Sequence, residues 1–410
     1  MHRPLIGPRV GTSPASATTL VNHLIRCVRN LWRGLRQPPK LRLWPGCKGL
    51  RGAVAVPFDN WTCPAALQAA EFAVSRNTVV AGAHDMNTSP ATFPVRTAWR
   101  SLAAEYLGLA AALGALVLVF SLSTQHFFSR TTFLTIANQI PAALLIATAM
   151  TYVLVIAEID LSVGSVLGLC SCVLGVALTQ WQWPLPLALL AAAFAGLGCG
   201  AFNGAVSLRW RLPSFIVTLG MLEMARGGAH AVTQSQTQYI GASIGGIAEA
   251  HVLGLSLPFL LALAVVILAQ LVLTRTVFGR YLVAIGTNEE AVRLSGIDPR
   301  PIKLAVFLLA GLLVALAAVI DTARFQAANP NAGTGFELQA IAAAVIGGTS
   351  LMGGRGSVVS TCFGVLIIAV LNSGLAAVGA KDELKRLVTG AVIVAAVILD
   401  QYRHRLARSH

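Results

Sequence analysis

The chain has 410 residues, of which 56% are hydrophobic and only 11% are charged, and its mean hydropathy is +0.72. These proportions exclude a soluble globule of this length, whose surface would need many more charged side chains, and they place the chain in a lipid bilayer. The formal net charge is +14. A polytopic membrane chain has no soluble domain on which a nucleic-acid-binding surface would form, so we expect no nucleic-acid partner.

Residues 1–85 differ in composition from the rest of the chain, because they hold 11 Lys and Arg against 3 Asp and Glu. Pro, Arg, Trp and Gly are scattered through them without a period, and no short apolar run follows a basic start as in a secretory signal. We therefore expect a poorly ordered basic leader. An alternative hypothesis is that translation starts at Met86, which opens a polar cytoplasmic segment of ordinary length, residues 86–101, before the first span.

Apolar runs recur between residues 102 and 400, and many have the length of about 20 residues that crosses a hydrocarbon layer of roughly 30 Å. They predict an all-α polytopic membrane protein with about ten transmembrane helices. The expected spans are residues 102–123, 136–157, 161–179, 184–208, 213–232, 257–276, 302–323, 338–351, 358–378 and 387–400. Glycine interrupts the third and the eighth, so we expect these two to be broken or short, which lipid permits where protein shields the backbone or a cavity adjoins it.

Lys and Arg are distributed unequally between the segments that join the spans. With a cytoplasmic N-terminus and ten spans, the inside segments hold 13 Lys and Arg and the outside segments hold 5. Basic residues accumulate on the cytoplasmic side of membrane proteins. We therefore expect both termini in the cytoplasm, including a short tail at residues 401–410, and residues 234–255 outside the cell.

The longest inside loop, residues 278–303, is rich in charged residues. Asn288 is expected to cap a short helix that has Glu289 and Glu290 in its first turn, Arg293 a turn later and Gly296 at its end. One interpretation is a solvated connector. However, a connector needs only a few residues and this loop has about 26. We therefore favour a docking surface for a cytoplasmic partner.

Two carboxylates, Glu158 and Asp160, lie where the second span is expected to end. Acids within a membrane are costly and are often functional. The alternative is a helix-end pair in which Asp160 and Ser162 cap the third span. Other polar residues in or beside the spans are candidates for a transport path, although hydrogen bonds between helices would explain them equally well. The complete set of path candidates is Asn138, Gln139, Glu158, Asp160, Ser162, Asn203, Thr218 and Asn372.

Two spacing patterns predict contacts that the spans make. Glu223 and Arg226 are three residues apart in the fifth span, so we expect them to neutralise each other as a structural pair. Gly164 with Gly168, and Gly200 with Gly204, are small residues four apart, a spacing that lets helices approach closely.

No pattern of catalytic chemistry emerges from the sequence. We find no combination of nucleophile, base and metal ligands, and the His residues are scattered. The glycine-rich stretch at residues 347–357 lacks the Lys of a nucleotide-binding loop and follows no expected strand. We therefore predict no catalytic, cofactor-binding or metal site, and we expect any ATP hydrolysis to be carried out by a separate subunit.

Four separated segments carry a resemblance to a known family. They are AEIDLSVGSVLG at residues 157–168, LPSFIVTLG at residues 212–220, the loop at residues 278–303 and AIAAAVIGGTSLMGGRGS at residues 340–357. In this order they resemble the ribose/xylose-type sugar permeases of ATP-binding-cassette (ABC) importers, within the branched-chain amino acid/sugar permease superfamily. The likeness covers the chain after Met86. EIDLSVGS is closest to the xylose branch, although the chain lacks that branch's long insertion between the fifth and sixth spans.

The resemblance implies an ABC importer permease fold in the bacterial inner membrane. It also implies three kinds of partner: a second permease subunit (a homodimer), two cytoplasmic ATPase subunits that use the ATP, and a periplasmic sugar-binding protein. The residues that it implies for coupling to the ATPase are Gly286, Asn288, Glu289, Glu290, Ala291, Arg293, Ser295 and Gly296.

Three functions remain open at this point. The resemblance favours import of a small sugar, such as the pentoses xylose or ribose. An ABC permease for branched-chain amino acids or another small solute would use the same machinery with a different cargo. A stand-alone secondary transporter would couple to ions through intramembrane acids or bases and would often show internal repeats, but the sequence has no convincing repeat and the docking loop would be unexplained.

Overall fold

The structure is a computed structural model. It describes residues 95–124, 127–252, 255–381, 383–385, 387–392, 394–395 and 398. The chain divides into two units, Met1–Ala91 and Thr92–His410, and all described residues belong to the second. The leader at residues 1–85, the start at Met86 and the tail at residues 401–410 lie outside the described residues, so those predictions stay predictions.

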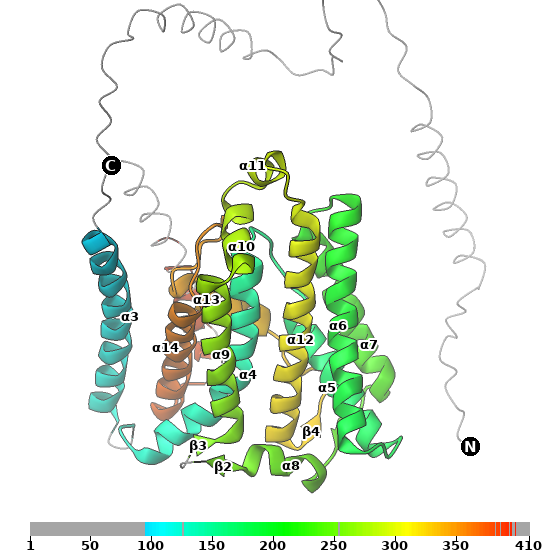
Figure 1. The fold of residues 1–410 in the computed structure, drawn as a ribbon. Coiled ribbons are helices and arrows are strands. Elements are labelled where there is room, and N and C mark those ends of the chain that lie inside the picture. Colours follow the sequence, from blue (N-terminus) through cyan, green and yellow to red (C-terminus); the bar gives the residue numbers. More distant parts are fainter. Residues whose placement is uncertain are drawn as a thin grey trace, which may run out of the picture. The chain divides into compact units, whose positions relative to one another are not determined.

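Among the residues that the structure describes, six helices are long and apolar enough to cross a membrane (Figure 1). They are α3 (Val95–Ser123), α4 (Arg130–Val155), α6 (Leu185–Trp210), α9 (Leu257–Arg275), α12 (Pro299–Phe325) and α14 (Val358–Ala377). The other described helices are α5 (Val163–Thr179), α7 (Ser214–Thr233), α8 (Ala242–Glu249), α10 (Val277–Thr287), α11 (Glu289–Leu294) and α13 (Phe336–Ile346). The prediction of an all-α polytopic membrane protein is confirmed.

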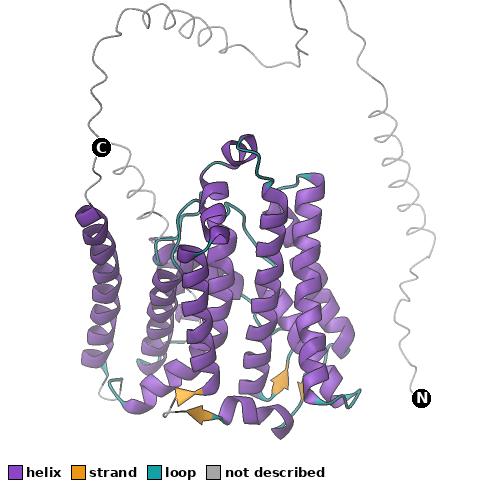
Figure 2. Cartoon of the chain, in the orientation of Figure 1, coloured by secondary structure: helices purple, strands orange, loops and turns teal. Residues whose placement is uncertain are grey.

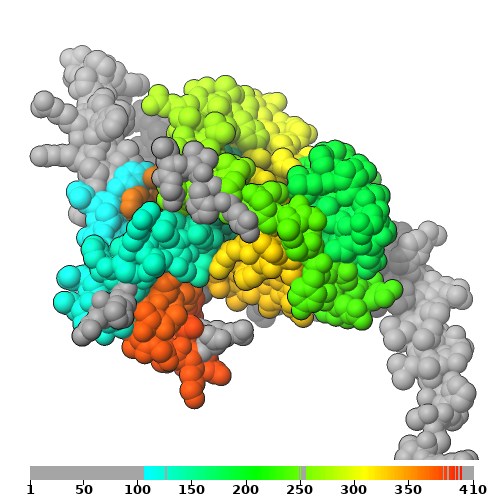
Figure 3. All heavy atoms as spheres, turned by 90° about the horizontal axis from the view of Figure 1, so that it is seen from below, coloured from blue at the N-terminus to red at the C-terminus, as the bar shows by residue number. Residues whose placement is uncertain are grey.

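Four two-residue strands are the only described strands, and they do not alter this class. β1 (Gln238–Tyr239) pairs antiparallel with β4 (Ala327–Ala328), and β2 (His251–Val252) pairs antiparallel with β3 (Leu255–Ser256). The strands lie with α8 at one end of the bundle, and α11 lies at the other end (Figures 1 and 2). Figure 3 views the end that carries α8.

The third and eighth expected spans are short, as the sequence predicts. α5 has 17 residues and α13 has 11, which correspond to lengths of about 25 Å and 16 Å at 1.5 Å per residue. After α13 the chain continues through turns to α14, so the predicted helix over residues 338–351 is wrong in its last turn. The cause is the run of glycines that begins at Gly347, because Gly348 has a φ of +83° that ends the helix.

Two other boundaries differ from the prediction. α4 starts at Arg130, six residues before the expected start, because Ser129 caps it by accepting a hydrogen bond from the backbone N–H of Thr132.

The expected loop at residues 278–303 contains two helices instead of one. The first is α10, whose Leu282 and Ile285 are buried, so one face of this charged segment packs on the bundle. The last expected span, residues 387–400, lies only partly within the described residues.

α12 packs against α4, α5 and α6. Its close approach to α6 depends on glycine: a Cβ at Gly200 would collide with the carbonyl oxygen of Phe307, and one at Gly204 would lie 2.8 Å from a methyl carbon of Leu304. The predicted close packing at Gly200 and Gly204 is therefore confirmed. Gly164 is also closely approached, by the side-chain carboxylate of Glu337 at the start of α13 and by the loop carbonyl of Gly333.

Candidate transport site

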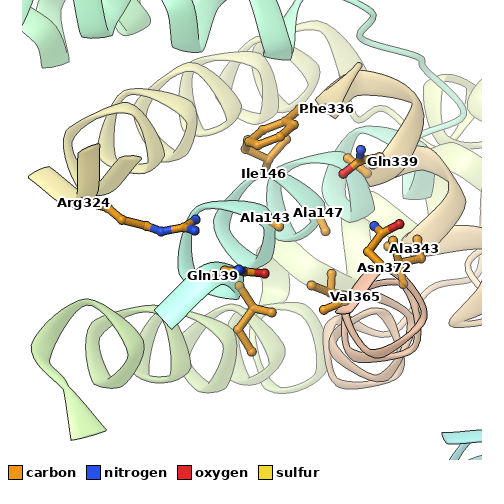
Figure 4. A pocket seen from close by; sticks show the side chains of 14 residues that line it. Gln139, Ala143, Ile146, Ala147, Arg324, Phe336, Gln339, Ala343, Val365 and Asn372 are labelled. Atoms are coloured by element: carbon orange, nitrogen blue, oxygen red, sulfur yellow. The ribbon is translucent and has the colours of Figure 1, made fainter. Parts of the chain in front are cut away.

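A cavity of about 330 Å³ with a mainly apolar wall lies between α4, α13, α14 and the end of α12 (Figure 4). We call it the chamber. Four polar side chains line it, one from each of these helices: Gln139, Arg324, Gln339 and Asn372. The apolar part of its wall consists of Ile140, Ala143, Ile146, Ala147, Phe336, Ala340, Ala343, Val365, Ile368 and Ala369.

The chemistry of the chamber suits a neutral solute that carries hydroxyl groups. Amide side chains both donate and accept hydrogen bonds, and a guanidinium donates up to five. In Figure 4 the amides of Gln139, Gln339 and Asn372 and the guanidinium of Arg324 extend toward a common space, with Phe336 at its edge. Among the described residues no carboxylate lines the chamber, so a cationic group would find no partner there.

A second cavity of about 440 Å³, the vestibule, adjoins the chamber. The two cavities share Gln139 and Asn372 as lining residues. The rest of the vestibule lining is largely polar and comprises Thr131, Thr132, Thr135, Ser373, Ala376, Ala377 and Lys385. Since Thr131 belongs to the first turn of α4, at the α8 end of the bundle, the vestibule lies toward that end, and the two amides that it shares with the chamber lie between the two cavities.

At the other end of the bundle, α10 and α11 form what we call the coupling element, residues 277–298. The side chain of Asn288 accepts a hydrogen bond from the N–H of Ala291 (3.0 Å), with Glu289 and Glu290 in the first turn of α11. Gly296 follows the helix with a φ of +87°, a conformation that glycine adopts without strain. The predicted short, capped helix is confirmed in its cap, its charges and its terminal glycine.

The coupling element packs backbone to backbone against the end of α4. A Cβ at Gly286 would collide with the carbonyl oxygen of Val155. The same carbonyl accepts a hydrogen bond from the N–H of Gly354 (2.9 Å), which lies in the glycine-rich loop between α13 and α14. The end of α4, the end of α10 and this loop therefore meet at one point.

A buried lysine connects the same parts by charge. Lys303 Nζ donates to Glu158 Oε1 (2.6 Å) and to Glu289 Oε2 (2.7 Å). We call these three residues the charge clamp. The Lys303 side chain is 8% exposed, the Glu158 side chain 16% and the Glu289 side chain 47%. The clamp thus joins α11 and α12 to the chain that follows α4.

Residues 156–162 form an extended break between α4 and α5, and side chains satisfy its backbone. The N–H of Ile159 donates to Ser214 Oγ (3.0 Å), and the N–H of Leu161 donates to Thr218 Oγ1 (3.1 Å). Asp160 accepts from both the N–H (2.8 Å) and the hydroxyl (2.6 Å) of Ser162. The hydroxyl of Ser162 in turn accepts from Asn203 Nδ2 (3.0 Å).

Comparison with known proteins assigns the chain to a family. A family profile described as the branched-chain amino acid transport system / permease component matches residues 132–397. The chain belongs to this permease family. Its relatives include the ribose import permease protein RbsC of Haemophilus influenzae, 37% identical over 296 residues that cover 71% of this chain and 91% of the relative.

Two further relatives of this permease family support the assignment. RbsC of Bacillus subtilis is 37% identical over 303 residues, covering 72% of this chain and 93% of that protein. The fructose import permease protein FrcC of Rhizobium meliloti is 32% identical over 316 residues, covering 72% and 87%. No solved structure gives a significant match. The predicted resemblance to ribose-type permeases is confirmed.

In the structure, the predicted path residues separate into four groups. Gln139 and Asn372 line both cavities, whereas their neighbour Asn138 is exposed and lines neither. Glu158 belongs to the charge clamp. The remaining four, Asp160, Ser162, Asn203 and Thr218, hydrogen-bond at the break between α4 and α5.

Two predictions, one about Ser162 and one about the pair Glu223 and Arg226, are wrong. Ser162 makes no side-chain capping bond to α5, because its hydroxyl is held by Asp160. Glu223 and Arg226 form no ion pair within the described part of the chain. Arg226 instead donates to the carbonyl oxygens of Pro330 (2.7 Å) and Ala332 (3.0 Å), while Glu223 is exposed. Carbonyls of a distant loop satisfy the cation, and spacing along one helix could not predict that.

Lys303, Arg324 and Gln339 are site residues that the sequence alone did not single out. In the sequence, Lys303 and Arg324 stand out only as basic residues flanking a span. One feature of the sequence does mark them: each is a basic residue near an end of the long apolar helix α12. A charged side chain in that position needs an oppositely charged partner or a water-filled cavity. No group of three His, Cys, Asp or Glu side chains that could hold a metal ion occurs among the residues that the structure describes.

Proposed function

We propose that this chain is the membrane-spanning permease subunit of an ATP-driven importer and that its cargo is a neutral monosaccharide. The observation that carries this proposal is the chamber, in which amides, a guanidinium and an aromatic ring surround a space of about 330 Å³. Sugars are bound by such combinations of planar polar groups and apolar surface. The relatives named for import of ribose and fructose support the same cargo class.

The chamber also favours a sugar over a branched-chain amino acid. A zwitterionic amino acid needs a cationic partner for its carboxylate and an anionic or strongly accepting partner for its ammonium group. Arg324 supplies the first. Among the described lining residues no carboxylate supplies the second, whereas hydroxyl groups are matched by the three amides.

The proposed energy source is a pair of separate cytoplasmic ATPase subunits that dock on the coupling element. The residues proposed for that contact are Gly286, Asn288, Glu289, Glu290, Ala291, Arg293, Ser295 and Gly296. α11 projects from the bundle (Figure 1) and presents Leu294, which is 81% exposed. A second copy of the chain would complete the pore, and a periplasmic sugar-binding protein would deliver cargo at the α8 end.

This proposal requires α11 in the cytoplasm and α8 outside. We expect a membrane-impermeant thiol reagent to label Tyr239→Cys in intact cells and to label Leu294→Cys only after the membrane is permeabilised, in a chain whose native cysteines have been replaced. The two sites are matched, because Tyr239 is 82% exposed and Leu294 81%. The reverse labelling pattern would overturn the orientation and, with it, the assignment of the coupling element.

The cargo is tested with the chain, its ATPase and its binding protein in proteoliposomes that contain ATP. Labelled ribose, fructose and leucine are offered separately. We expect uptake of a monosaccharide and none of leucine above the rate of empty vesicles. Leucine uptake without sugar uptake would replace the proposal with the amino-acid alternative.

The same assay examines the chamber. Gln139→Leu removes a donor and an acceptor that both cavities share, so hydroxyl groups of the cargo would lose their partners at a cost of about 1–3 kcal/mol. We expect sugar uptake at low cargo concentration to fall roughly tenfold or more. Asn138→Leu is the matched control, since it changes the adjacent amide, which lines neither cavity. Equal uptake by the two variants would show that cargo does not pass through the chamber.

A further inference from the structure

The charge clamp joins three segments that are far apart in the chain. Lys303 lies in the second turn of α12, 145 residues after Glu158 and 14 residues after Glu289. Its ammonium group makes short contacts with both carboxylates and is almost fully shielded from water. A buried ammonium group is costly to leave unpaired. If one carboxylate moves, Lys303 must therefore either move with it or resist its movement.

The two arms of the clamp differ in exposure. The Glu158 side chain is 16% exposed, so its contact with Lys303 forms in a nearly dry environment. The Glu289 side chain is 47% exposed, and water can therefore replace Lys303 as its partner at a low cost. The arm to Glu158 is therefore the more shielded contact, and the arm to α11 is the one that breaks more readily.

Glu158 belongs to the break between α4 and α5, which is the segment best placed to change shape. Its backbone lacks helical hydrogen bonds at Ile159 and Leu161 and depends on the hydroxyls of Ser214 and Thr218 in α7. Ala157 has a φ of +60°, a conformation that is strained for a residue other than glycine. A displacement of Glu158 would therefore act on α4, α5 and α7 together.

We propose that Lys303 is the positioning residue through which motion of α11 reaches the break between α4 and α5. This inference rests on the proposed function, in which α11 receives the ATPase. When both contacts of the clamp are formed, Lys303 fixes the position of α11 relative to residues 156–162. When the Glu289 arm opens, α11 moves without the break, and ATP hydrolysis is no longer converted into transport. The Gly286–Val155 contact supplies a steric attachment beside this charged one.

The test compares sugar uptake per ATP hydrolysed in proteoliposomes of the complete complex. We expect Lys303→Met and Glu289→Gln each to lower this ratio by at least about tenfold. Lys303→Arg should restore most of it, because a guanidinium can bond two carboxylates at once. Arg300→Gln is the matched control on α12, since it removes an exposed cation that makes no ion pair among the described residues.

The measurement separates transmission from docking and from folding. Lys303 is 8% exposed and lines a cavity of about 690 Å³ together with Glu158 and Glu289, so binding of the ATPase is measured beside the uptake ratio. Uncoupling by Lys303→Met with the ATPase bound as in the wild type places the defect inside the permease. Should that variant not assemble, Glu289→Gln is the second test, because its side chain is 47% exposed and Lys303 keeps Glu158 as a partner. Since Glu289 is also proposed to contact the ATPase, its ratio is compared at equal ATPase binding and equal melting temperature. A wild-type ratio of uptake to hydrolysis in Glu289→Gln would overturn the inference. No ATP-driven uptake by the wild type would instead contradict the proposed function itself.

Discussion

Gly200→Val is expected to destabilise the helix bundle strongly. A Cβ at this position would collide with the carbonyl oxygen of Phe307 and would lie 3.0 Å from its carbonyl carbon. Both atoms belong to the backbone of α12, so no side-chain rotation relieves the contact and the two helices must separate. Overpacking of this kind costs about 1–3 kcal/mol and sometimes more. We expect a clear fall in the melting temperature of the purified protein and a lower yield from the membrane.

Gly198→Val is the matched control, because it carries the same cost of a β-branched residue in the same helix. No atom lies within 4 Å of a Cβ built at Gly198. Its melting temperature should stay close to that of the wild type. Equal destabilisation by the two substitutions would show that helix propensity, and not the approach of α6 to α12, determines the effect.

The features that the sequence predicted correctly depend on local physics. Apolar run length alone indicates the membrane helices, since the bilayer sets the length that a span needs. The cap at Asn288 and the stop at Gly296 follow from side-chain hydrogen bonding and backbone sterics within a short segment. Small residues four apart mark the surface of α6 that meets α12, whatever the identity of the partner helix.

The features that the sequence did not predict depend on distant residues. The pairing of Lys303 with Glu158 links positions 145 residues apart, and no local pattern specifies it. The spacing along α7 predicts an ion pair between Arg226 and Glu223, but a loop about 100 residues further along the chain supplies the acceptors of Arg226. The chamber takes one polar side chain from each of four helices, so Gln139 and Asn372 could be named as candidates, but not their convergence with Arg324 and Gln339.

Dependence on ATP is the second large effect that we expect. A secondary transporter binds its coupling ion at intramembrane acids or bases beside the cargo site. The described lining of the chamber contains no acid. Two buried carboxyl groups, those of Asp160 and Asp321, lie elsewhere among the described residues, and Asp160 accepts hydrogen bonds from Ser162. The chamber therefore offers no acid at which a coupling ion would bind beside the cargo, and we expect uptake to require ATP on the side of α11.

The decisive measurement is sugar uptake by proteoliposomes that contain the complete complex, with ATP enclosed in one preparation and ADP in another, and with the binding protein and labelled sugar outside. We expect accumulation only in vesicles that contain ATP, none with an ATPase subunit that cannot hydrolyse it, and none when a proton or sodium gradient is imposed without ATP. Accumulation driven by a gradient in ADP-loaded vesicles would contradict the proposed function and assign the chain to the secondary transporters.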